Sequence, residues 1–196
     1  MKPEVLHHQT YETYLALTAQ GTEKYEFHDG MITAMAGGSL EHGQIAMNAG
    51  IALGSALLRA GASCILFSSD VKIWIGQTRR SYYPDLSVTC DPPERSEQDP
   101  HALTNPVLIL EVLSESTEAF DRCSKFNHYR ELPSLREYVL LSQSAAQADL
   151  YYRTHAGGSA WEISSAEGLA SEVHLKSLRI RVPMRELYRL VPGIDI

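Results

Sequence analysis

The sequence lacks several features that would settle its class at once. Its three cysteines, Cys64, Cys90 and Cys123, include no CxxC pair, and Met1-Lys2-Pro3-Glu4 begins no apolar run of the kind that a signal peptide needs. The cell interior, and hence a cytoplasmic location, is therefore the expectation. No apolar stretch reaches the roughly 20 residues of a transmembrane helix, which predicts a soluble protein with no membrane partner.

Positive charge is scarce as well. The formal net charge is −7 and the isoelectric point is about 5.6, so the chain lacks the overall basic character that favours non-specific binding to nucleic acids. Any such contact then depends on a local basic patch. Six residues are candidates for one, although scattered basic residues are more often a solvated face: Lys72, Arg79, Arg80, Arg122, Lys125 and Arg130.

Motifs of other enzyme classes are also missing. No glycine-rich loop has P-loop spacing, no GxSxG elbow marks a hydrolase, and the histidines, among them His7-His8, lack the spacing of a zinc site. With 196 residues and no internal repeat, the chain predicts a single domain over residues 1–196.

Local patterns predict helices and strands along the whole chain. In the N-terminal part we expect a helix capped by Thr10, a β-hairpin over 24–35 that turns at Asp29-Gly30, and a helix between Ser39 and Gly61. Three strands, over Cys64–Ile75, Ser81–Cys90 and Pro106–Leu113, are then followed by a helix from Ser114 to Pro133. The C-terminal part should contain strands over Glu137–Ser142, Ala148–Arg153, Trp161–Ser164 and Leu175–Val182 and a helix over Met184–Leu190. Alternation within Cys64–Ile75 predicts a wetter face that carries Asp70, Lys72 and Trp74. Residues 91–106 are polar and bounded by prolines, so we expect a surface loop there.

Two carboxylates interrupt these apolar strands. Asp85 follows Pro84 within Ser81–Cys90, and Glu111 stands inside Pro106–Leu113. A carboxylate in such a strand must be paired, hydrogen-bonded or bound to a metal, because burying a lone charge is too costly. On adjacent strands the two side chains can converge on one cation. The alternative is that Asp85 merely follows a strand-bending proline and Glu111 merely pairs with a core arginine.

The order helix, strand, strand, strand, helix, strand, with Pro-Asp on the second strand of the trio and Glu on the third, resembles the PD-(D/E)XK core of the restriction-endonuclease-like fold. Ordered blocks extend the resemblance over nearly the whole chain, to the Uma-two family of restriction endonucleases. These blocks are Tyr25-Glu26, Asp29-Gly30, Glu41-His42, Asp70-Val71, Pro84-Asp85-Leu86, Glu111-Val112-Leu113-Ser114, Ser116-Thr117, Asp121, Lys125, Tyr129 and Glu137-Tyr138.

The resemblance implies an α/β fold with a mixed central sheet flanked by helices. It also implies a metal-dependent endonuclease that hydrolyses phosphodiester bonds in nucleic acid, with DNA as the expected substrate and a homodimer as the expected assembly. Asp85, Glu111 and the main-chain carbonyl of Val112 are the implied ligands of Mg²⁺, for which Mn²⁺ is the expected substitute.

One position departs from the pattern. Nucleases of this superfamily place a lysine two residues after the glutamate, where this chain has Leu113. Lys125 is the candidate substitute, because its flexible stem can bring an ammonium back to the site, and Asp121 and Tyr129 share its face of the expected helix. The alternative is an ordinary solvent-exposed ion pair between Asp121 and Lys125, which would contribute little.

Two further residues are candidates for supporting roles. Glu26 would add a carboxylate to the site, and His42 would serve as a hydrogen-bond donor or proton carrier, unless it is only a cap or surface residue. A nearby helix N-terminus would disfavour the charged form of His42. The rival function is a catalytically inactive module that binds nucleic acid or protein with the same fold, because Leu113 already changes one catalytic position.

Overall fold

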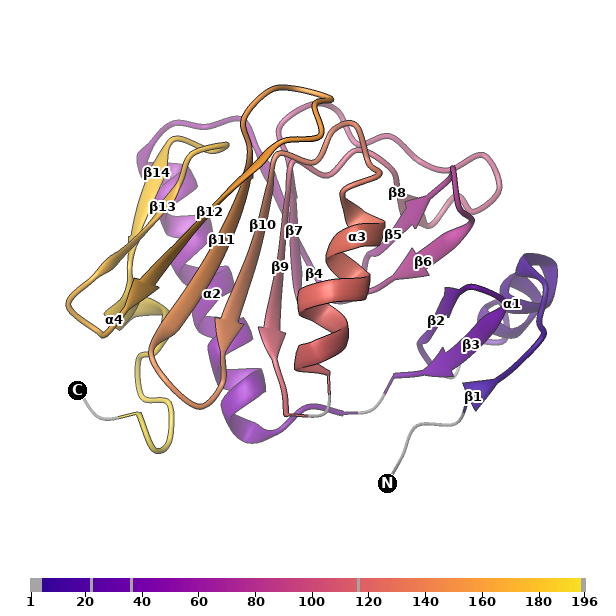
Figure 1. Cartoon of the computed structure of the whole chain (residues 1–196), viewed down its shortest axis with the longest axis horizontal. Coiled ribbons are helices and arrows are strands. Elements are labelled where there is room, and N and C mark those ends of the chain that lie inside the picture. Colours follow the sequence, from indigo (N-terminus) through magenta and orange to yellow (C-terminus); the bar gives the residue numbers. More distant parts are fainter. Residues whose placement is uncertain (1–4, 22, 36, 116, 195–196) are drawn as a thin grey trace.

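The computed structural model describes residues 5–21, 23–35, 37–115 and 117–194, so Met1–Glu4 and Ser116 of the motifs above lie outside the described residues. The fold is mixed α/β, with two six-stranded sheets and a separate two-stranded hairpin (Figure 1). Each six-stranded sheet is mixed, because one of its strand pairs is parallel and the others are antiparallel. In the part of the chain that the structure describes, no helix is long and apolar enough to span a membrane.

The first sheet has the order β1-β3-β2-β6-β5-β8. Its strands are β1 (Val5–Leu6), β2 (Tyr25–His28), β3 (Met31–Ala34), β5 (Lys72–Ile75), β6 (Arg80–Tyr82) and β8 (Ala102–Leu103), and α1 (Tyr11–Thr18) packs beside them. The predicted N-terminal helix and hairpin are confirmed. Thr10 caps α1, since its hydroxyl oxygen accepts the N–H of Thr13 at 3.2 Å.

The second sheet has the order β12-β11-β10-β9-β7-β4. Its strands are β4 (Ile65–Ser68), β7 (Leu86–Thr89), β9 (Leu108–Leu113), β10 (Glu137–Ser142), β11 (Gln147–Arg153) and β12 (Trp161–Glu167). Helix α2 (Leu40–Arg59) covers one face, and α3 (Phe126–Tyr129) with the π-helical segment before it, η1 (Phe120–Lys125), covers the other (Figure 1). Ser39 caps α2 as predicted, because its hydroxyl accepts the N–H of His42 at 3.1 Å.

The chain crosses between the two sheets five times, and two of these crossings correct a prediction. The segment Cys64–Ile75 is not one strand but β4 in the second sheet and β5 in the first. Likewise Ser81–Cys90 divides into β6 and β7 on either side of Pro84, which has no N–H to give to a sheet ladder. The wetter face expected to carry Asp70, Lys72 and Trp74 is wrong for the two residues in β5, although Asp70 before the strand is exposed. All four residues of β5 are buried, and the ammonium of Lys72 is paired with the buried carboxylate of Asp99.

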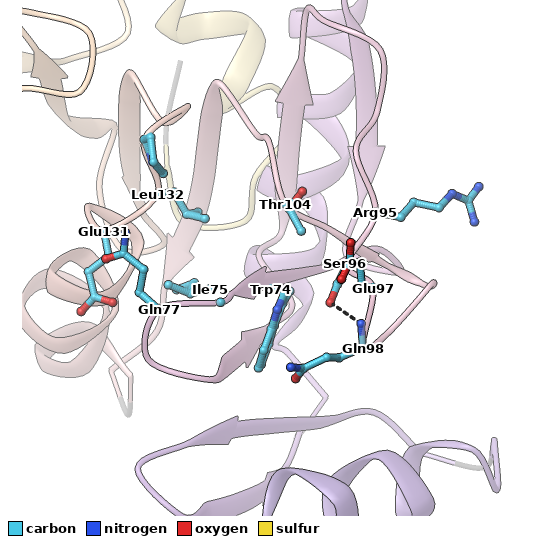
Figure 2. Close-up of a pocket in the computed structure, with 12 residues that line it drawn as sticks. Trp74, Ile75, Gln77, Arg95, Ser96, Glu97, Gln98, Thr104, Glu131 and Leu132 are labelled. Atoms are coloured by element: carbon cyan, nitrogen blue, oxygen red, sulfur yellow. Dashed lines mark hydrogen bonds between the residues drawn. The ribbon is translucent and has the colours of Figure 1, made fainter.

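The surface loop expected over 91–106 is in part a packed segment. It contains β8, whose residues pair in parallel with Lys72 and Ile73 of β5, and both β8 residues are buried. Figure 2 shows the hollow of about 370 Å³ that lies between this segment and β5, with the N–H of Gln98 donating to the hydroxyl of Ser96 at 3.2 Å. The polar composition misled the prediction because some of its polar groups bond within the segment, although most of residues 91–101 are exposed: the N–H of Asp99 donates to the hydroxyl of Ser96, and the amide of Asn105 donates to the carbonyl of Pro92.

The C-terminal segment also differs from its prediction. In place of one strand over Leu175–Val182 there is a hairpin, β13 (Glu172–Leu175) and β14 (Ile180–Pro183), followed by α4 (Met184–Leu187). The buried carboxylate of Glu137 accepts the N–H groups of Lys176 and Ser177 and so fixes the turn. Such a long-range acceptor cannot be read from the local pattern.

Two of the three cysteines are joined. Cys64 and Cys90 form a disulfide between the positions that flank the antiparallel pair β4 and β7, while Cys123 is free and exposed. The absence of a CxxC pair therefore did not exclude a disulfide.

Candidate active site

Asp85 lies at the point where the chain enters the second sheet. The pairing of β7 with β9 ends at Leu86 and Leu110, one residue after Asp85. Beyond that point the side chain of Asp85 replaces the main-chain partner of β9, because its Oδ2 accepts the N–H of Val112 at 2.7 Å. The break at Pro84 thus holds the carboxylate against the C-terminal end of β9.

Strand alternation directs Glu111 to the α3 face of the sheet. Its neighbours Leu110 and Val112 belong to the hydrophobic cluster under α2, whereas Ile109 and Leu113 belong to the cluster under α3. Glu111 is only 4 % exposed. Leu113, at the position where the PD-(D/E)XK pattern would place a lysine, packs in that apolar cluster.

Lys125, the last residue of η1, brings a cation to this face. Its Nζ lies 3.1 Å from Oε1 of Glu111, 3.4 Å from Oε1 of Glu26 and 3.5 Å from Oδ1 of Asp121. The lysine is 7 % exposed, so the alternative of a solvent-exposed ion pair is wrong. The segment that carries it is a π-helix rather than the regular helix expected, a feature that is frequent at functional sites.

Two tyrosines surround this lysine and glutamate from the protein interior. The hydroxyl of Tyr129 donates to Oε1 of Glu111 at 3.2 Å, and the ring of Tyr82 has the ammonium of Lys125 5.6 Å from its centroid. Burial raises the pKa of Tyr129 well above its ordinary value, so its hydroxyl stays a donor. Tyr82 was missed in the sequence, since an aromatic residue near Pro84-Asp85 carries no signal of its own.

His42 and Glu26 approach from two other elements. At the start of α2, Nε2 of His42 donates to Oδ1 of Asp85 at 2.9 Å. That hydrogen bond raises the pKa of His42 despite its burial, so the helix N-terminus does not decide the charge as expected. On β2, Oε1 of Glu26 accepts the N–H of Tyr83 at 3.1 Å.

The site carries an excess of negative charge. Four carboxylates, those of Glu26, Asp85, Glu111 and Asp121, stand against the single ammonium of Lys125, which leaves a formal charge of −3 when His42 is neutral. Burial raises the pKa of Glu111 well above its ordinary value; Lys125 opposes this rise, and the charges of Asp121 and Asp85 add to it. Burial also raises the pKa of Asp121, and the ammonium of Lys125, 3.5 Å from its Oδ1, opposes this rise. Such a group of acids favours a bound cation.

These residues open into one cleft of about 930 Å³. Its walls include Glu26, His42, Asp85, Glu111, Val112, Asp121 and Lys125, together with Gly37–Ser39, Ser114, Thr117 and Gln143. Tyr129 lies beneath this surface, fully buried. The structure therefore brings all the predicted site residues to one place, from β2, α2, β9, η1 and α3 and the junction before β7.

The donor chemistry suits Mg²⁺ or Mn²⁺. Within the described ranges, no group of three or more His, Cys, Asp and Glu side chains is arranged to hold a metal ion. Mg²⁺, however, commonly takes only one or two protein carboxylates and completes its shell with waters and substrate phosphates. Asp85 and Glu111 supply that number of carboxylates beside an open cleft.

The basic patch considered from the sequence does not form. Arg80 is paired with Asp29 and Glu131, and Arg122 with Glu118 and Asp149. Lys72 and Lys125 are buried in ion pairs, as described above. Most of the candidate cations are thus neutralised by neighbours within the chain.

Comparison with known proteins now bears on this cleft. A sequence model described as Uma2, putative restriction endonuclease, matches residues 11–183. The chain belongs to the Uma2 family. That match includes every residue of the candidate site.

Relatives of this Uma2 protein occur in Synechocystis sp. (strain ATCC 27184 / PCC 6803 / Kazusa). The uncharacterized protein slr1290 is 37% identical over 178 residues, which cover 91% of this chain and 90% of that one. The uncharacterized protein sll1609 is 33% identical over 171 residues, 87% of this chain and 94% of that one.

A solved structure has a similar fold. The crystal structure of a putative nuclease belonging to DUF820 from Anabaena variabilis ATCC 29413 superposes with a TM-score of 0.70 and covers 91% of the Uma2 chain and 97% of its own. Its sequence is 16% identical, so the likeness concerns the fold alone.

Proposed function

We propose that this Uma2 protein is a metal-dependent nuclease that hydrolyses phosphodiester bonds, with DNA as its substrate. The observation that carries the proposal is the contact of 3.1 Å between Lys125 and Glu111, with Asp85 fixed beside them through Val112. Two acids and a lysine are the groups that the PD-(D/E)XK core uses. Here the lysine arrives from η1 instead of from position 113.

The arrangement of the second sheet supports the same superfamily. Strands β4, β7, β9 and β10 are neighbours in that order, and α2 and α3 lie on opposite faces. Omitting β5, β6 and β8, which belong to the first sheet, the chain order is α2, β4, β7, β9, η1, α3, β10. With η1 and α3 taken as one helical segment, this order supports the proposal of a PD-(D/E)XK core.

Asp85 and Glu111 would hold Mg²⁺, with the carbonyl of Val112 as a further oxygen. When bound, the ion supplies Lewis-acid stabilisation of the phosphoryl charge and lowers the pKa of water. The ammonium of Lys125 would donate to a phosphate oxygen as negative charge develops. Asp121 and the ring of Tyr82 hold that ammonium in place.

The remaining residues position these groups. His42 orients Asp85 through Nε2 and stands where a proton can be passed to the cleft. Tyr129 orients Glu111 from below. Glu26 contacts both Lys125 and the N–H of Tyr83, which ties the first sheet to the site.

Plasmid nicking tests the proposal. Purified protein with Mn²⁺ should convert supercoiled plasmid to the open circle, and Asp85→Ala should not. Duplex DNA, single-stranded DNA and RNA are offered in parallel. If the wild-type protein cleaves none of them faster than Asp85→Ala does, the catalytic proposal fails, and the inactive binding module takes its place.

A further inference from the structure

Helix α2 exposes an apolar stripe to solvent. Leu40, Met47, Ile51 and Leu58 are 82%, 63%, 61% and 84% exposed, although the opposite side of the same helix is buried against the second sheet. At about 100° per residue, the four side chains lie within roughly 40° of one another around the helix axis. A contiguous apolar patch of this kind on a soluble protein marks an interaction surface.

The stripe is self-complementary. Its residues are spaced by seven, four and seven positions, and this series of spacings reads the same from either end of the helix. Two copies of α2 that run antiparallel would therefore match Leu40 with Leu58 of the second copy, and Met47 with Ile51 of the second copy. A two-fold interface requires this property, because the same patch must fit itself.

Three small residues, Gly43, Gly54 and Ser55, flank the stripe. In the antiparallel register Gly43 faces Ser55 of the second copy, and Gln44 faces Gly54 of the second copy. A Cβ added at Gly43 would meet nothing within 4 Å, so the helix surface is open there, whereas Leu66 of β4 already lies 3.8 Å from a Cβ added at Gly54. The pairing of Gly43 with Ser55 therefore lets the two helix backbones approach closely.

The ends of the helix carry opposite charges. Glu41 stands in the first turn and Arg59 in the last, on the same side of the stripe at about 100° from its centre. A two-fold axis keeps both on one side of the helix pair and puts Glu41 within about one turn of Arg59 of the second copy. The two ion pairs would fix the antiparallel direction.

We propose that α2 pairs antiparallel with α2 of a second copy through the stripe Leu40, Met47, Ile51 and Leu58, which makes the protein a two-fold dimer. A stable interface buries about 1,200 Å² or more in total, so residues beside the helix must contribute as well. Leu190, 70% exposed, is an apolar neighbour available for this, because Asn48 of α2 donates to the carbonyl oxygen of the adjacent Arg189 at 2.8 Å. The proposal is independent of the nuclease function, because it rests on surface pattern alone.

Light scattering coupled to gel filtration of the full-length chain is the first test. The wild-type protein should have about twice the monomer mass of 21.8 kDa. Met47→Glu/Ile51→Glu puts like charges at the centre of the interface and should give a monomer. This monomer should still be folded, so in dilute solution its melting temperature should not be below that of the wild-type monomer. Ile163→Glu is the matched control, since Ile163 is 64% exposed on β12, and it should leave the dimer intact.

Charge exchange and cross-linking test the direction. Glu41→Arg and Arg59→Glu should each weaken dimerisation by roughly tenfold or more, and the double variant should recover it. For cross-linking, Leu40→Cys and Leu58→Cys are made separately in a Cys123→Ser background and mixed. A short bismaleimide should join one variant to the other, because the two cysteines then face each other across the interface. It should join neither variant to itself, because the two identical cysteines would lie at opposite ends of the helix pair, about 27 Å apart. A monomeric wild type, a dimer that survives Met47→Glu/Ile51→Glu, or self-linking of Leu40→Cys would each overturn the proposal.

Discussion

Oε1 of Glu111 accepts hydrogen bonds from Lys125 at 3.1 Å and from Tyr129 at 3.2 Å, and both donors come from the helical segment that follows its strand. A PD-(D/E)XK pattern would place a lysine at position 113, where this chain has Leu113 as a core residue. The cation beside Glu111 comes instead from Lys125 at the end of η1.

Mg²⁺ or Mn²⁺ should stabilise the protein, and Asp85→Asn or Glu111→Gln should remove that gain. Binding to the native state alone adds about 2.7 kcal/mol to the free energy of unfolding at a metal concentration of 100 Kd. Thermal melts with and without metal measure it. Asp70→Asn, which changes an exposed acid paired with Lys24, should keep the full shift. An undiminished shift in both site variants would place the ion elsewhere.

Lys125→Met should lower the turnover rate by about 10²–10³-fold without weakening metal binding, because the charge acts mainly in the transition state. Removal of this buried cation also leaves its carboxylates unpaired, which should cost about 3–5 kcal/mol of stability in the absence of metal. Added Mn²⁺ should restore part of that loss. Arg122→Met, three residues earlier and paired at the surface, is the control and should leave turnover unchanged. Full turnover in a folded Lys125→Met protein would remove Lys125 from the mechanism.

Tyr129→Phe should destabilise the protein by about 1 kcal/mol, since one buried hydrogen bond to Glu111 is lost while the ring still fills its place. We expect a fall in turnover of less than tenfold, with the Michaelis constant unchanged. Urea unfolding and steady-state kinetics measure the two effects. A loss as large as that of Lys125→Met would give the hydroxyl a direct part in the reaction.

Acid should destabilise the fold through His128. Burial lowers the pKa of His128, which contacts the hydroxyl of Tyr82 through Nδ1 at 2.6 Å. A folded-state pKa below the unfolded value of about 6.5 means that the unfolded chain binds the extra proton, so stability falls as the pH drops below about 6.5. In His128→Asn, which keeps an acceptor but cannot titrate, the melting temperature should fall less between pH 7.5 and 5.5, as calorimetry will show. Equal falls in the two proteins would contradict this origin.

Reduction of the disulfide should also destabilise the protein. Cys64 and Cys90 are 26 positions apart, and closure of a loop of that length contributes about 3.5 kcal/mol in the chain-entropy treatment. Denaturant unfolding with and without dithiothreitol measures this difference. Cys64→Ser/Cys90→Ser should behave like the reduced protein and should not respond to dithiothreitol; Cys123→Ser should respond as the wild type does.

The sequence predicted those parts of the fold that local chemistry controls. Ser39 and Thr10 cap their helices, and Asp29-Gly30 turns a hairpin, because these features depend on a few neighbouring residues. The exchange of strands between sheets was not predictable in this way. The apolar pattern continues through Pro84, and nothing in it tells that β6 and β7 belong to different sheets.

The candidate site was predictable as a set of residues but not as a geometry. Buried acids at positions 85 and 111 are visible in the sequence because they interrupt apolar strands. Their partners depend on long-range packing. The sequence around these residues therefore gave no sign of the Tyr82 ring near Lys125, or of the hydrogen bond that Asp85 accepts from the N–H of Val112. The π-helical form of η1 was equally hidden.

The ammonium of Lys125 touches one acid from each six-stranded sheet, Glu26 on β2 and Glu111 on β9. It is thus a mechanical link as well as a chemical group, because any opening between the sheets must stretch at least one of the two contacts. A ligand that drew Lys125 away from either acid would loosen this link, so we expect binding in the cleft to change how firmly the two sheets are held together.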